Sequence, residues 1–295
     1  MRHWQAILLG LLASMMLGCV SNRNARPTSW LDRFLQPAGP VGPDTIQMDV
    51  ALIEKPFGDS YLNRDLWNDA DEQIIPLENK AVLEDNGFRI GQIGGITPVG
   101  LQLLLASERS CANPRRIRCL QDKANKLVLG PESPTCSFQL GTDGNPTEVN
   151  LDKAQCTLEV TASLSADGRT KLRFVPQVFH GDTSLLPRPA GDLSGWILKE
   201  ERAVERYAQF AWEVTLGNEF LIVGGRYEKP HTLGHECFLR RDEQNPVQRL
   251  LVIRTHRAEK PSEEPAAPVA TDGKAVRSPA GACQASYTTA RGSQR

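Results

Sequence analysis

The segment from Cys156 to Phe174 restricts the fold more than any other part of the chain. Apolar and polar residues alternate from Cys156 to Leu164, and Ala166-Asp167-Gly168 separates this run from a second one, Thr170–Phe174. Successive side chains of a β-strand point to opposite faces, so each run is typical of a strand with one buried face. A turn with Asp-Gly between two such runs predicts a β-hairpin. The chain therefore contains an antiparallel sheet that lies against a core.

Further apolar segments predict more strands on either side of this hairpin. Ile46–Glu54 alternates at first and then becomes continuously apolar, as in a strand that is covered on both faces. Ala208–Val214 and Phe220–Val223 flank Gly217-Asn218, two residue types that tolerate a positive φ, and predict a second hairpin. Arg249–Arg254 is expected to be the last strand of the domain.

Short helices are expected between the first strand and the hairpins. The segments are Tyr61–Asn68, Pro76–Asn86 and Pro98–Arg109. The second of these has Pro near its start and Asn86-Gly87 as a stop signal, which is the usual asymmetry of a helix. A mainly antiparallel sheet with two or three short helices inserted after the first strand belongs to the α+β class.

The order of these segments resembles the core domain of the secretins, the ring-forming outer-membrane channels of bacterial secretion and pilus systems. Ile46–Glu54 is similar to the opening strand of that core, Cys156–Pro176 to a hairpin, and Asn218–Gly225 to a turn and a strand that ends in Gly-Gly. Arg249–Arg254 stands where the family has its closing strand. The residues similar to the family's later motifs are Gly224, Gly225, Pro230, Leu233, Gly234 and Phe238. The resemblance implies a secretin-core-like, β-rich domain over residues 45–257.

The chain also departs from the secretin pattern. Only a short tether precedes the first strand, whereas secretins have ring-stacking domains there, and the closing strand lacks its terminal Pro. The segment between Cys111 and Cys136 does not align with the family's membrane-crossing strands, so a pore is not implied. The basic residues of this segment are Arg115, Arg116, Arg118, Lys123 and Lys126, and Arg109 lies just before it. We interpret them as a solvated face of a hairpin or helix; the alternative is a site for lipopolysaccharide or another anionic partner.

Residues 1–18 have the pattern of a bacterial lipoprotein signal peptide. A basic start precedes the apolar run Ala6–Leu17, which is too short to span a bilayer as a helix. Met16-Leu17-Gly18-Cys19 resembles a lipobox, so we expect Cys19 to be lipidated and to anchor the chain in a membrane. A plain signal peptide is the alternative, and the protein is exported in both cases. The expected location is the bacterial envelope, on the periplasmic face of the outer membrane.

Two segments are expected to lie outside the folded domain. Residues 19–44 end in the Pro/Gly-rich run Pro37–Pro43 and are interpreted as a lipidated tether. Residues 258–295 contain no Leu, Ile, Phe, Met or Trp, and such a composition predicts disorder. The charge balance of 34 Lys and Arg against 35 Asp and Glu speaks against nucleic acid as a partner. A second copy of the chain or another envelope protein is the expected protein partner.

The cysteines of the exported chain permit disulfides. Besides Cys19, the chain contains Cys111, Cys119, Cys136, Cys156, Cys237 and Cys283. Cys111 and Cys119 bracket a short basic loop and are the first candidate pair. Cys136 and Cys156 are the second candidate pair, because each lies beside a candidate strand. Cys156 is explained equally well as a small buried residue on the apolar face of its strand.

One group of residues resembles a metal site. His231, His235 and Cys237 lie close in sequence, but two imidazoles at this spacing share a face only in a helix. Pro230 and Gly234 argue against a helix, so we interpret the segment as a surface loop before a strand and expect no metal.

Catalytic and cofactor motifs are not identified. Gly91–Gly95 is rich in Gly but lacks the Gly-Lys-Ser/Thr end of a phosphate-binding loop, and we interpret it as a turn. The acidic residues Glu54, Asp59, Asp65, Asp69, Asp71 and Glu72 form a local group. They lack the spacing and the central Gly of a calcium loop, and we interpret them as a solvated surface. We therefore expect no enzyme activity and no cofactor.

Two functions fit these observations. The first is a non-catalytic envelope lipoprotein with a secretin-like domain, which acts as a structural or assembly component related to secretion machinery. The alternative is a periplasmic ligand-binding lipoprotein, without pore or ring formation, whose pocket lies near Asp59–Gln73 and the turn at Gly91–Pro98.

Overall fold

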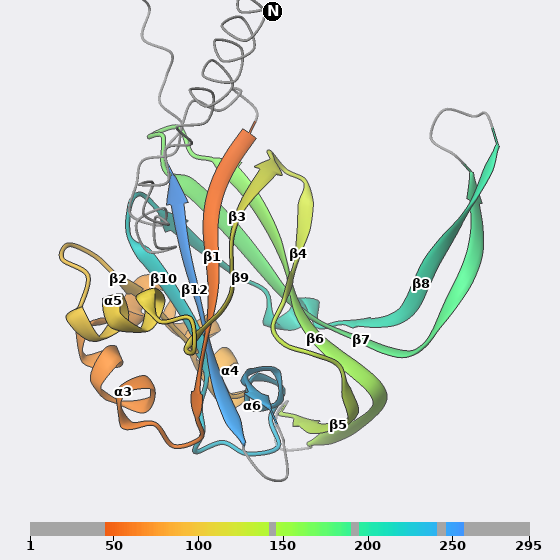
Figure 1. Ribbon diagram of the computed structural model, residues 1–295, viewed down its shortest axis with the longest axis horizontal. Helices are drawn as coiled ribbons and strands as arrows, with labels where there is room; N and C mark the ends of the chain where they lie inside the picture. The colour runs from red at the N-terminus through yellow and green to blue at the C-terminus, as the bar shows by residue number, and fades with distance from the viewer. Residues whose placement is uncertain (1–44, 142–145, 190–194, 241–245, 257–295) are drawn as a thin grey trace, which may run out of the picture. The chain divides into compact units, whose positions relative to one another are not determined.

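The computed structural model describes residues 45–141, 146–189, 195–240 and 246–256. The predicted signal peptide, the lipidation of Cys19, the tether, Cys283 and the tail lie outside these residues. The described part forms two six-stranded antiparallel sheets, here called sheet A and sheet B, with a few short helices (Figure 1). This architecture confirms the predicted α+β class with mainly antiparallel strands.

Sheet A is built around the first and the last strand of the described chain. In spatial order its strands are β2 (Phe88–Ile93), β10 (Phe220–Gly225), β12 (Val247–His256), β1 (Thr45–Pro56) and β3 (Cys111–Leu120), and β11 (Leu239–Arg240) pairs with one end of β12. The register of β1 and β12 runs from Gln47 opposite His256 to Pro56 opposite Val247. The predicted first and last strands are therefore confirmed, and they are direct neighbours.

Both faces of sheet A are covered, which explains why β1 reads as a continuously apolar run. Ile46, Met48 and Val50 point into the core between the two sheets. Ala51 and Ile53 point to the opposite face, where three helical segments cover them. These segments are α3 (Ser60–Asn63), the 3₁₀ helix η1 (Asp65–Asp69) and α5 (Val99–Ala106). A strand that is buried on both sides needs no polar alternation.

The other helical segments are equally short. They are η2 (Glu72–Ile74), α4 (Leu77–Asp85), η3 (Ala208–Phe210) and α6 (Leu233–Phe238). The helices predicted before Asn86 and after Pro98 are confirmed as α4 and α5. The one predicted at residues 61–68 is divided into α3 and η1.

Sheet B contains the hairpin that the sequence predicts most clearly. Its strands are β4 (Ala124–Val128), β6 (Thr147–Leu164), β7 (Thr170–Pro189) and β8 (Trp196–Arg206), while β5 (Ser133–Leu140) pairs with β6 and β9 (Trp212–Leu216) pairs with β7. Leu164 lies opposite Thr170, so β6 and β7 form the expected hairpin. Both strands continue well beyond the segments predicted for them.

The second predicted hairpin is wrong. β9 belongs to sheet B and β10 to sheet A, so the chain crosses between the sheets at Gly217-Asn218. Trp212 on β9 explains this arrangement, because its indole stacks on Phe174 of sheet B, with ring centroids 5.2 Å apart, and lies 5.8 Å from the ring of Phe88 of sheet A. Apolar alternation is the same for a strand of either sheet, so the pattern could not assign the two strands to different sheets.

Candidate functional site: the β7–β8 hairpin

Strand β7 consists of a buried half and an exposed half. Residues 170–179 pair with β6, and the first of them also pair with β9. From His180 onward β7 pairs only with β8, and the register shifts between His180 and Ser184, where Gly181 has a φ of +72°. A shift of this kind is a β-bulge, which bends a strand. We call residues 184–189 and 196–201 the distal hairpin; it extends away from the two sheets (Figure 1).

The distal hairpin exposes large apolar side chains. They are Leu185, Leu186, Trp196, Ile197 and Leu198. Trp196 is 73% exposed and Leu198 is 68% exposed. In the described part of the chain, neither strand of the distal hairpin pairs with a third strand, so both outer edges present backbone N–H and C=O groups to solvent. Exposed apolar groups and open strand edges are each typical of a surface that binds another protein.

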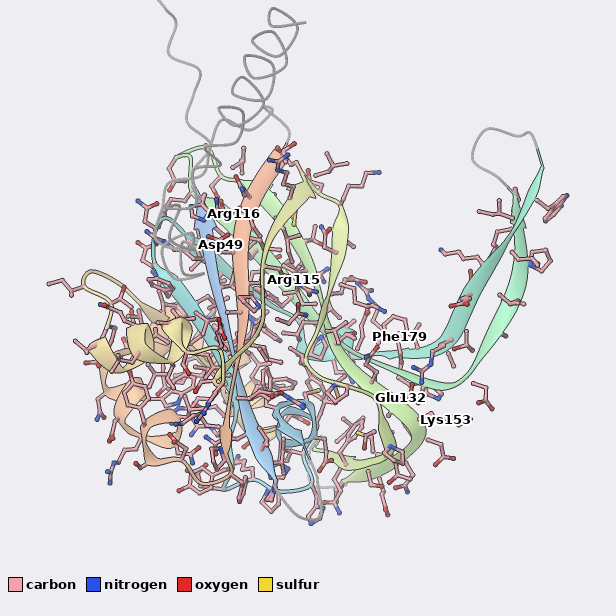
Figure 2. All side chains as sticks on the ribbon, in the orientation of Figure 1. Asp49, Arg115, Arg116, Glu132, Lys153 and Phe179 are labelled. Carbon is pink, nitrogen blue, oxygen red and sulfur yellow. The ribbon has the colours of Figure 1, made fainter. Side chains whose placement is uncertain are left out.

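The root of the hairpin, residues 180–183 and 202–204, is fixed by ion pairs. The guanidinium of Arg202 donates to a carboxylate oxygen of Glu132 at 2.7 Å, to the carbonyl of Gly181 at 3.2 Å and to the carbonyl of Lys153. The ammonium of Lys153 pairs with Asp182, and this hydrogen bond raises the pKa of Lys153. Figure 2 shows Glu132 and Lys153 close to the start of the hairpin. The contacts of the root with Glu132 and Lys153 therefore orient the hairpin, although the two sheets do not cover its apolar side chains.

One ion pair lies on the distal hairpin itself. Nε and Nη2 of Arg188 donate to the two carboxylate oxygens of Glu201 at 2.9 and 2.7 Å. The hydrogen bond to Arg188 lowers the pKa of Glu201. Both side chains are solvated, so the pair adds little to stability, but it places a positive and a negative group beside the apolar residues.

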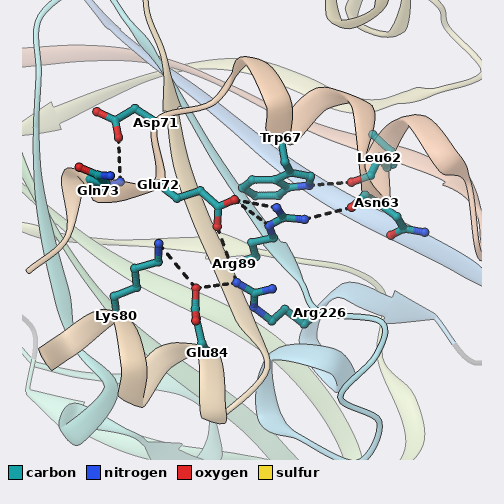
Figure 3. Close-up of polar contacts among 10 residues, drawn as sticks. All are labelled: Leu62, Asn63, Trp67, Asp71, Glu72, Gln73, Lys80, Glu84, Arg89 and Arg226. Carbon is teal, nitrogen blue, oxygen red and sulfur yellow. Dashed lines mark hydrogen bonds and ion pairs between the residues drawn. The ribbon is translucent and has the colours of Figure 1, made fainter. Parts of the chain in front are cut away.

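A second polar network lies on sheet A (Figure 3). Arg89 on β2 donates to Glu72 at 2.6 Å and to the carbonyl of Asn63 at 3.0 Å, and its guanidinium lies 4.3 Å from the ring centre of Trp67. Arg226 pairs with Glu84 of α4 and, at 3.7 Å, with Glu72. These contacts connect η1, η2, α4 and β2, so the network has a structural role.

The predicted acidic surface is only partly correct. Glu72 is mostly buried and pairs with Arg89, and Glu54 accepts a hydrogen bond from the buried Arg249 at 2.8 Å. Asp59 and Asp71 accept hydrogen bonds from the backbone N–H of Leu62 and Gln73 at the starts of α3 and η2. Glu54 and Glu72 are thus wrongly assigned to a solvated surface, because acidic residues next to short helices also serve as caps and as partners of buried Arg.

The predicted basic cluster is divided among several elements. The segment 111–136 forms β3, β4 and the start of β5, so it is built from strands of both sheets. Nε of Arg116 donates to the buried Asp49 at 2.6 Å, and Nε2 of His256 lies 2.6 Å from the other oxygen of Asp49 (Figure 2). Lys126 lies 4.0 Å from the ring centre of Phe179. Arg116 is therefore a structural residue of sheet A, and an anionic partner stays a prediction.

The pKa of Asp49 reflects two opposed effects. Burial alone would raise this pKa, but the hydrogen bonds from Arg116 and His256 and their charges outweigh it, so the pKa lies below its ordinary value. A carboxylate in such a position stays charged at neutral pH. Asp49 and His256 pair with each other and with Arg116, which gives the cluster a role in stability.

The structure does not support a disulfide between Cys111 and Cys119. Both thiols lie in the single extended strand β3, one near each end. A rise of about 3.3 Å per residue separates them by roughly 26 Å, whereas a disulfide needs Cα atoms within about 7 Å. Burial raises the pKa of each thiol to about 11. The expected loop is a strand of sheet A. Cys136 on β5 lies opposite Leu151 of β6, five residues from Cys156, and both cysteines are free thiols, so this second pairing stays a prediction.

His235 and Cys237 lie in a buried helix and not in a surface loop, whereas His231 is exposed. α6 begins at Leu233, after Thr232, and His231 precedes it with a φ of 61°. His235 and Cys237 are buried. Among the described residues, no group of three His, Cys, Asp or Glu side chains is arranged to hold a metal ion.

The glycines of the family-like motif explain why α6 can lie here. A Cβ atom on Gly225 would lie 2.8 Å from the carbonyl oxygen of Gly234, and one on Gly234 would lie 2.4 Å from the backbone of Gly87. The backbones of β10, α6 and the start of β2 therefore touch. Gly224 is buried in β10 next to its last residue, Gly225, and Leu233 and Phe238 are buried on α6. Pro230 lies in the connection between β10 and α6. Gly91, interpreted above as part of a turn, lies within β2.

A groove between the sheets lies near the pocket that the ligand-binding alternative predicts. Its volume is about 590 Å³, and its lining includes Ile74, Asn79, Gln92 and Trp212. Lys171 and Arg173, which also line it, pair with Glu213 at 2.6 and 3.7 Å. In the described residues, no helix is long and apolar enough to cross a membrane.

Comparison with known proteins finds only solved structures of low similarity. No protein-family model matches the chain, and no curated protein sequence matches it. The InvG secretin domain of the Salmonella SPI-1 injectisome aligns with 75% of this chain and 63% of its own chain, with 8% identity and a TM-score of 0.17. A second structure, the Salmonella SPI-1 type III secretion injectisome secretin InvG, aligns with 75% of this chain and 65% of its own chain, with 10% identity and a TM-score of 0.18. This chain spans less than two thirds of the length of both solved chains.

Proposed function

We propose that this chain is a non-catalytic structural or assembly component of the bacterial envelope, and that it associates with further copies of itself through the distal hairpin. The observation that carries the proposal is the exposed apolar strand pair with open edges, described above. The segment order that resembles the secretin core supports the same function. The lipobox-like sequence at Cys19 supports a lipid anchor in the envelope.

A second copy of the chain fits the distal hairpin better than a strongly charged partner does. A strand added to either edge would satisfy backbone groups and cover apolar side chains in a single step. The hairpin carries charges of both signs, since Arg188 and Lys199 lie near Glu200 and Glu201. Two antiparallel copies of such a surface are complementary in charge, and one interface of this kind on each edge permits a closed oligomer.

The ion pairs of sheet A and of the helices beside it support a non-catalytic function. Asp49, Arg116 and His256 hold one another in sheet A, and Arg89 and Glu72 do so beside Trp67. Each of these groups already has a structural partner, whereas a catalytic acid or base needs a position from which it can reach a substrate. A non-catalytic function is thus consistent with the structural pairing of these charged residues.

The proposal is tested by the native mass of the full-length protein after extraction with a mild detergent. We expect a discrete assembly for the natural sequence and a shift to the monomer for the double substitution Trp196→Glu and Leu198→Glu. Leu77→Glu on α4 is the matched control, because Leu77 is 80% exposed but lies outside the hairpin. A Cys19→Ala version separates association through the protein from clustering of lipid anchors. A monomeric natural protein, or an assembly that the double substitution leaves intact, contradicts the proposal.

The groove between the sheets favours the alternative of a ligand-binding lipoprotein. Its polar residues Gln92 and Lys171 would orient a small molecule beside Ile74, which is only partly buried. Under this alternative the protein is a monomer, and a small molecule raises its melting temperature. Lys171→Ala would then remove the gain in melting temperature without changing the native mass.

A further inference from the structure

Six polar side chains lie together on one face of sheet A, at the end where β1 begins. They come in pairs from β1, β3 and β12, and they are Gln47, Asp49, Arg116, Arg118, Arg254 and His256. Gln47 lies opposite Arg118 on one side and His256 on the other. Asp49 lies between Arg116 and Arg254 in the same way. Directly opposite residues of an antiparallel sheet point to the same face, and we call these six residues the arginine array.

Asp49 holds the guanidinium of Arg116 in a fixed position. Nε and Nη2 of Arg116 donate to the two carboxylate oxygens of Asp49 at 2.6 and 2.9 Å. Figure 2 shows both residues near the start of β1. Asp49 is 2% exposed, whereas the side chain of Arg116 is 30% exposed. A guanidinium that a buried carboxylate binds on one side is pre-organised, and its exposed part faces a solvent from which an anion can approach.

Arg254 lies on the other side of Asp49, on β12. Its guanidinium lies 5.2 Å from the ring centre of Phe220, and the residue is half-buried. Adjacent strands are about 4.8 Å apart, so the backbones of Arg116 and Arg254 are roughly 10 Å apart. Burial lowers the pKa of Arg254, although the charge of Asp49 opposes this effect. The charge of Arg254 is therefore poorly solvated, and an anion beside it would stabilise it.

Arg118 is the third cation of the array, and it is exposed. It lies two residues after Arg116 on β3, which places the two backbones about 7 Å apart along the strand. Arg118 makes no ion pair with any residue that the structure describes. A long side chain with this freedom can turn toward an anion that Arg116 and Arg254 attract.

We propose that the arginine array binds a phosphate group between the guanidinium groups of Arg116, Arg118 and Arg254. Three guanidinium groups against the one carboxylate of Asp49 leave two positive charges, and a phosphate group carries up to two negative charges. Guanidinium groups also match phosphate oxygens with paired N–H donors. The fold holds two of the three groups in place, so binding loses little side-chain entropy. The proposal goes beyond the association of the hairpin and does not depend on it.

The phosphate group can come from a membrane lipid or from a soluble phosphate compound. The array lies where β1 begins, and the expected lipidated tether, residues 19–44, directly precedes β1 in the sequence. A lipid head group is therefore within reach if Cys19 is anchored. Of the basic residues that the sequence places near the segment 111–136, only Arg116 and Arg118 belong to the array. Arg254 joins them from the last strand of the described chain.

The first test measures how the full-length protein binds inorganic phosphate at constant ionic strength. Phosphorus-31 NMR reports binding directly, and phosphate should also raise the melting temperature. Arg118→Ala should weaken phosphate binding about tenfold, because a charged hydrogen bond is lost. Arg118→Lys should recover only part of this loss, since an ammonium lacks the paired donors. Arg109→Ala is the matched control, because it removes an exposed positive charge just before the other end of β3, and it should not change binding.

Vesicles distinguish the two sources of the phosphate group. The Cys19→Ala version is used, so that a lipid anchor does not contribute. If the source is a lipid head group, this version should bind vesicles of anionic phosphatidylglycerol but not of phosphatidylcholine, and Arg118→Ala should abolish that binding. Binding of inorganic phosphate without binding of vesicles supports the proposal with a soluble phosphate compound as the source.

The proposal is overturned if the natural protein does not bind inorganic phosphate, or if Arg118→Ala leaves phosphate binding unchanged. It is also overturned if Arg109→Ala weakens binding as much as Arg118→Ala does, because the attraction would then be general. Arg254→Gln keeps the proposal testable if Arg118→Ala folds poorly. The folded fraction of Arg254→Gln should bind phosphate more weakly than the natural protein in the same NMR measurement.

Discussion

The two halves of β7 have the same backbone structure but opposite surroundings. Residues 170–179 lie between neighbouring strands, and Phe174 stacks on Trp212 in the core. Residues 184–189 keep a regular antiparallel pairing with β8, yet all of them are exposed. The comparison shows that the core does not determine where this strand ends. The exposed half retains Leu185 and Leu186, which a strand that faces only water has no physical reason to keep.

The largest expected effect comes from replacing one Trp in each region by Ala. Trp212→Ala removes an indole that is 1% exposed and packs against both sheets, so we expect the free energy of unfolding to fall by about 4 kcal/mol. Trp196→Ala on the distal hairpin should leave this free energy almost unchanged and should weaken the assembly. Denaturant unfolding monitored by circular dichroism measures the first effect, and native mass the second.

Equal losses of stability in these two variants would remove the distinction between the two halves of β7. That result would show that the distal hairpin folds back onto the body in solution.

The next effect concerns the polar part of sheet A. Asp49→Asn should lower the free energy of unfolding by about 3 kcal/mol at neutral pH, because the charge of Arg116 loses its buried partner and His256 loses the carboxylate oxygen beside its ring. The pKa of Asp49 in the folded protein lies below its ordinary value of 3.8. Its contribution is therefore present in full above that value and is lost as the pH falls through the lower, folded-state pKa.

The measurement is the free energy of unfolding of both proteins between neutral pH and strong acid. The difference between natural protein and variant should shrink only at acidic pH. A difference that stays constant down to the lowest pH would mean that Asp49 does not act through its charge.

Two glycines, Gly225 and Gly195, differ in how closely other atoms approach them. Gly225→Ala places a Cβ atom against the backbone of Gly234, so we expect a loss of about 2 kcal/mol as α6 is displaced. Gly195→Ala at the distal hairpin meets no atom within 4 Å and should be neutral. Thermal unfolding of both variants checks this, and a neutral Gly225→Ala would show that α6 can shift without strain.

The smallest effect is expected at the root of the hairpin. Arg202→Ala removes the contacts to Glu132 and Gly181 and should lower the free energy of unfolding by about 0.5 kcal/mol, since an ion pair with one exposed partner adds little. Amide hydrogen exchange should nevertheless become faster at Ser184 and Glu201, because the hairpin loses its anchor. Lys199→Ala is the control and should not change the exchange there. Unchanged exchange in Arg202→Ala would place the anchor elsewhere.

The sequence predicts those parts of the fold whose apolar pattern has a single reading. The hairpin of β6 and β7, the strands β1 and β12 and the helices α4 and α5 all follow from periodicity and from Pro or Gly at their ends. The separation of β9 from β10 does not, because it depends on the contact of Trp212 with rings of both sheets. The helix α6 depends on the contact of Gly225 with Gly234, which no local pattern encodes.

The candidate site was missed for a physical reason as well. The distal hairpin has apolar residues in two short runs, Leu185-Leu186 and Trp196-Ile197-Leu198, around a stretch that contains Pro and Gly. Strict alternation signals one buried face, and a strand pair that is exposed on both faces has no reason to alternate. Two apolar runs on either side of a turn were the available signal. Cys111 and Cys119 show the same limit, because they stand at opposite ends of the extended strand β3, whose pairing with β1 no local pattern shows.

The position of β12 has a consequence for the time course of folding. This strand is the last in the described chain, yet it lies between β10 and β1 within sheet A. A ribosome delivers the chain from its N-terminal end, so β1 must wait without this neighbour until almost all of the domain has been synthesised. Contacts between residues so distant in sequence form slowly. We therefore expect this domain to fold after synthesis and late, with the edges of β1 and β10 open to chaperones until β12 inserts.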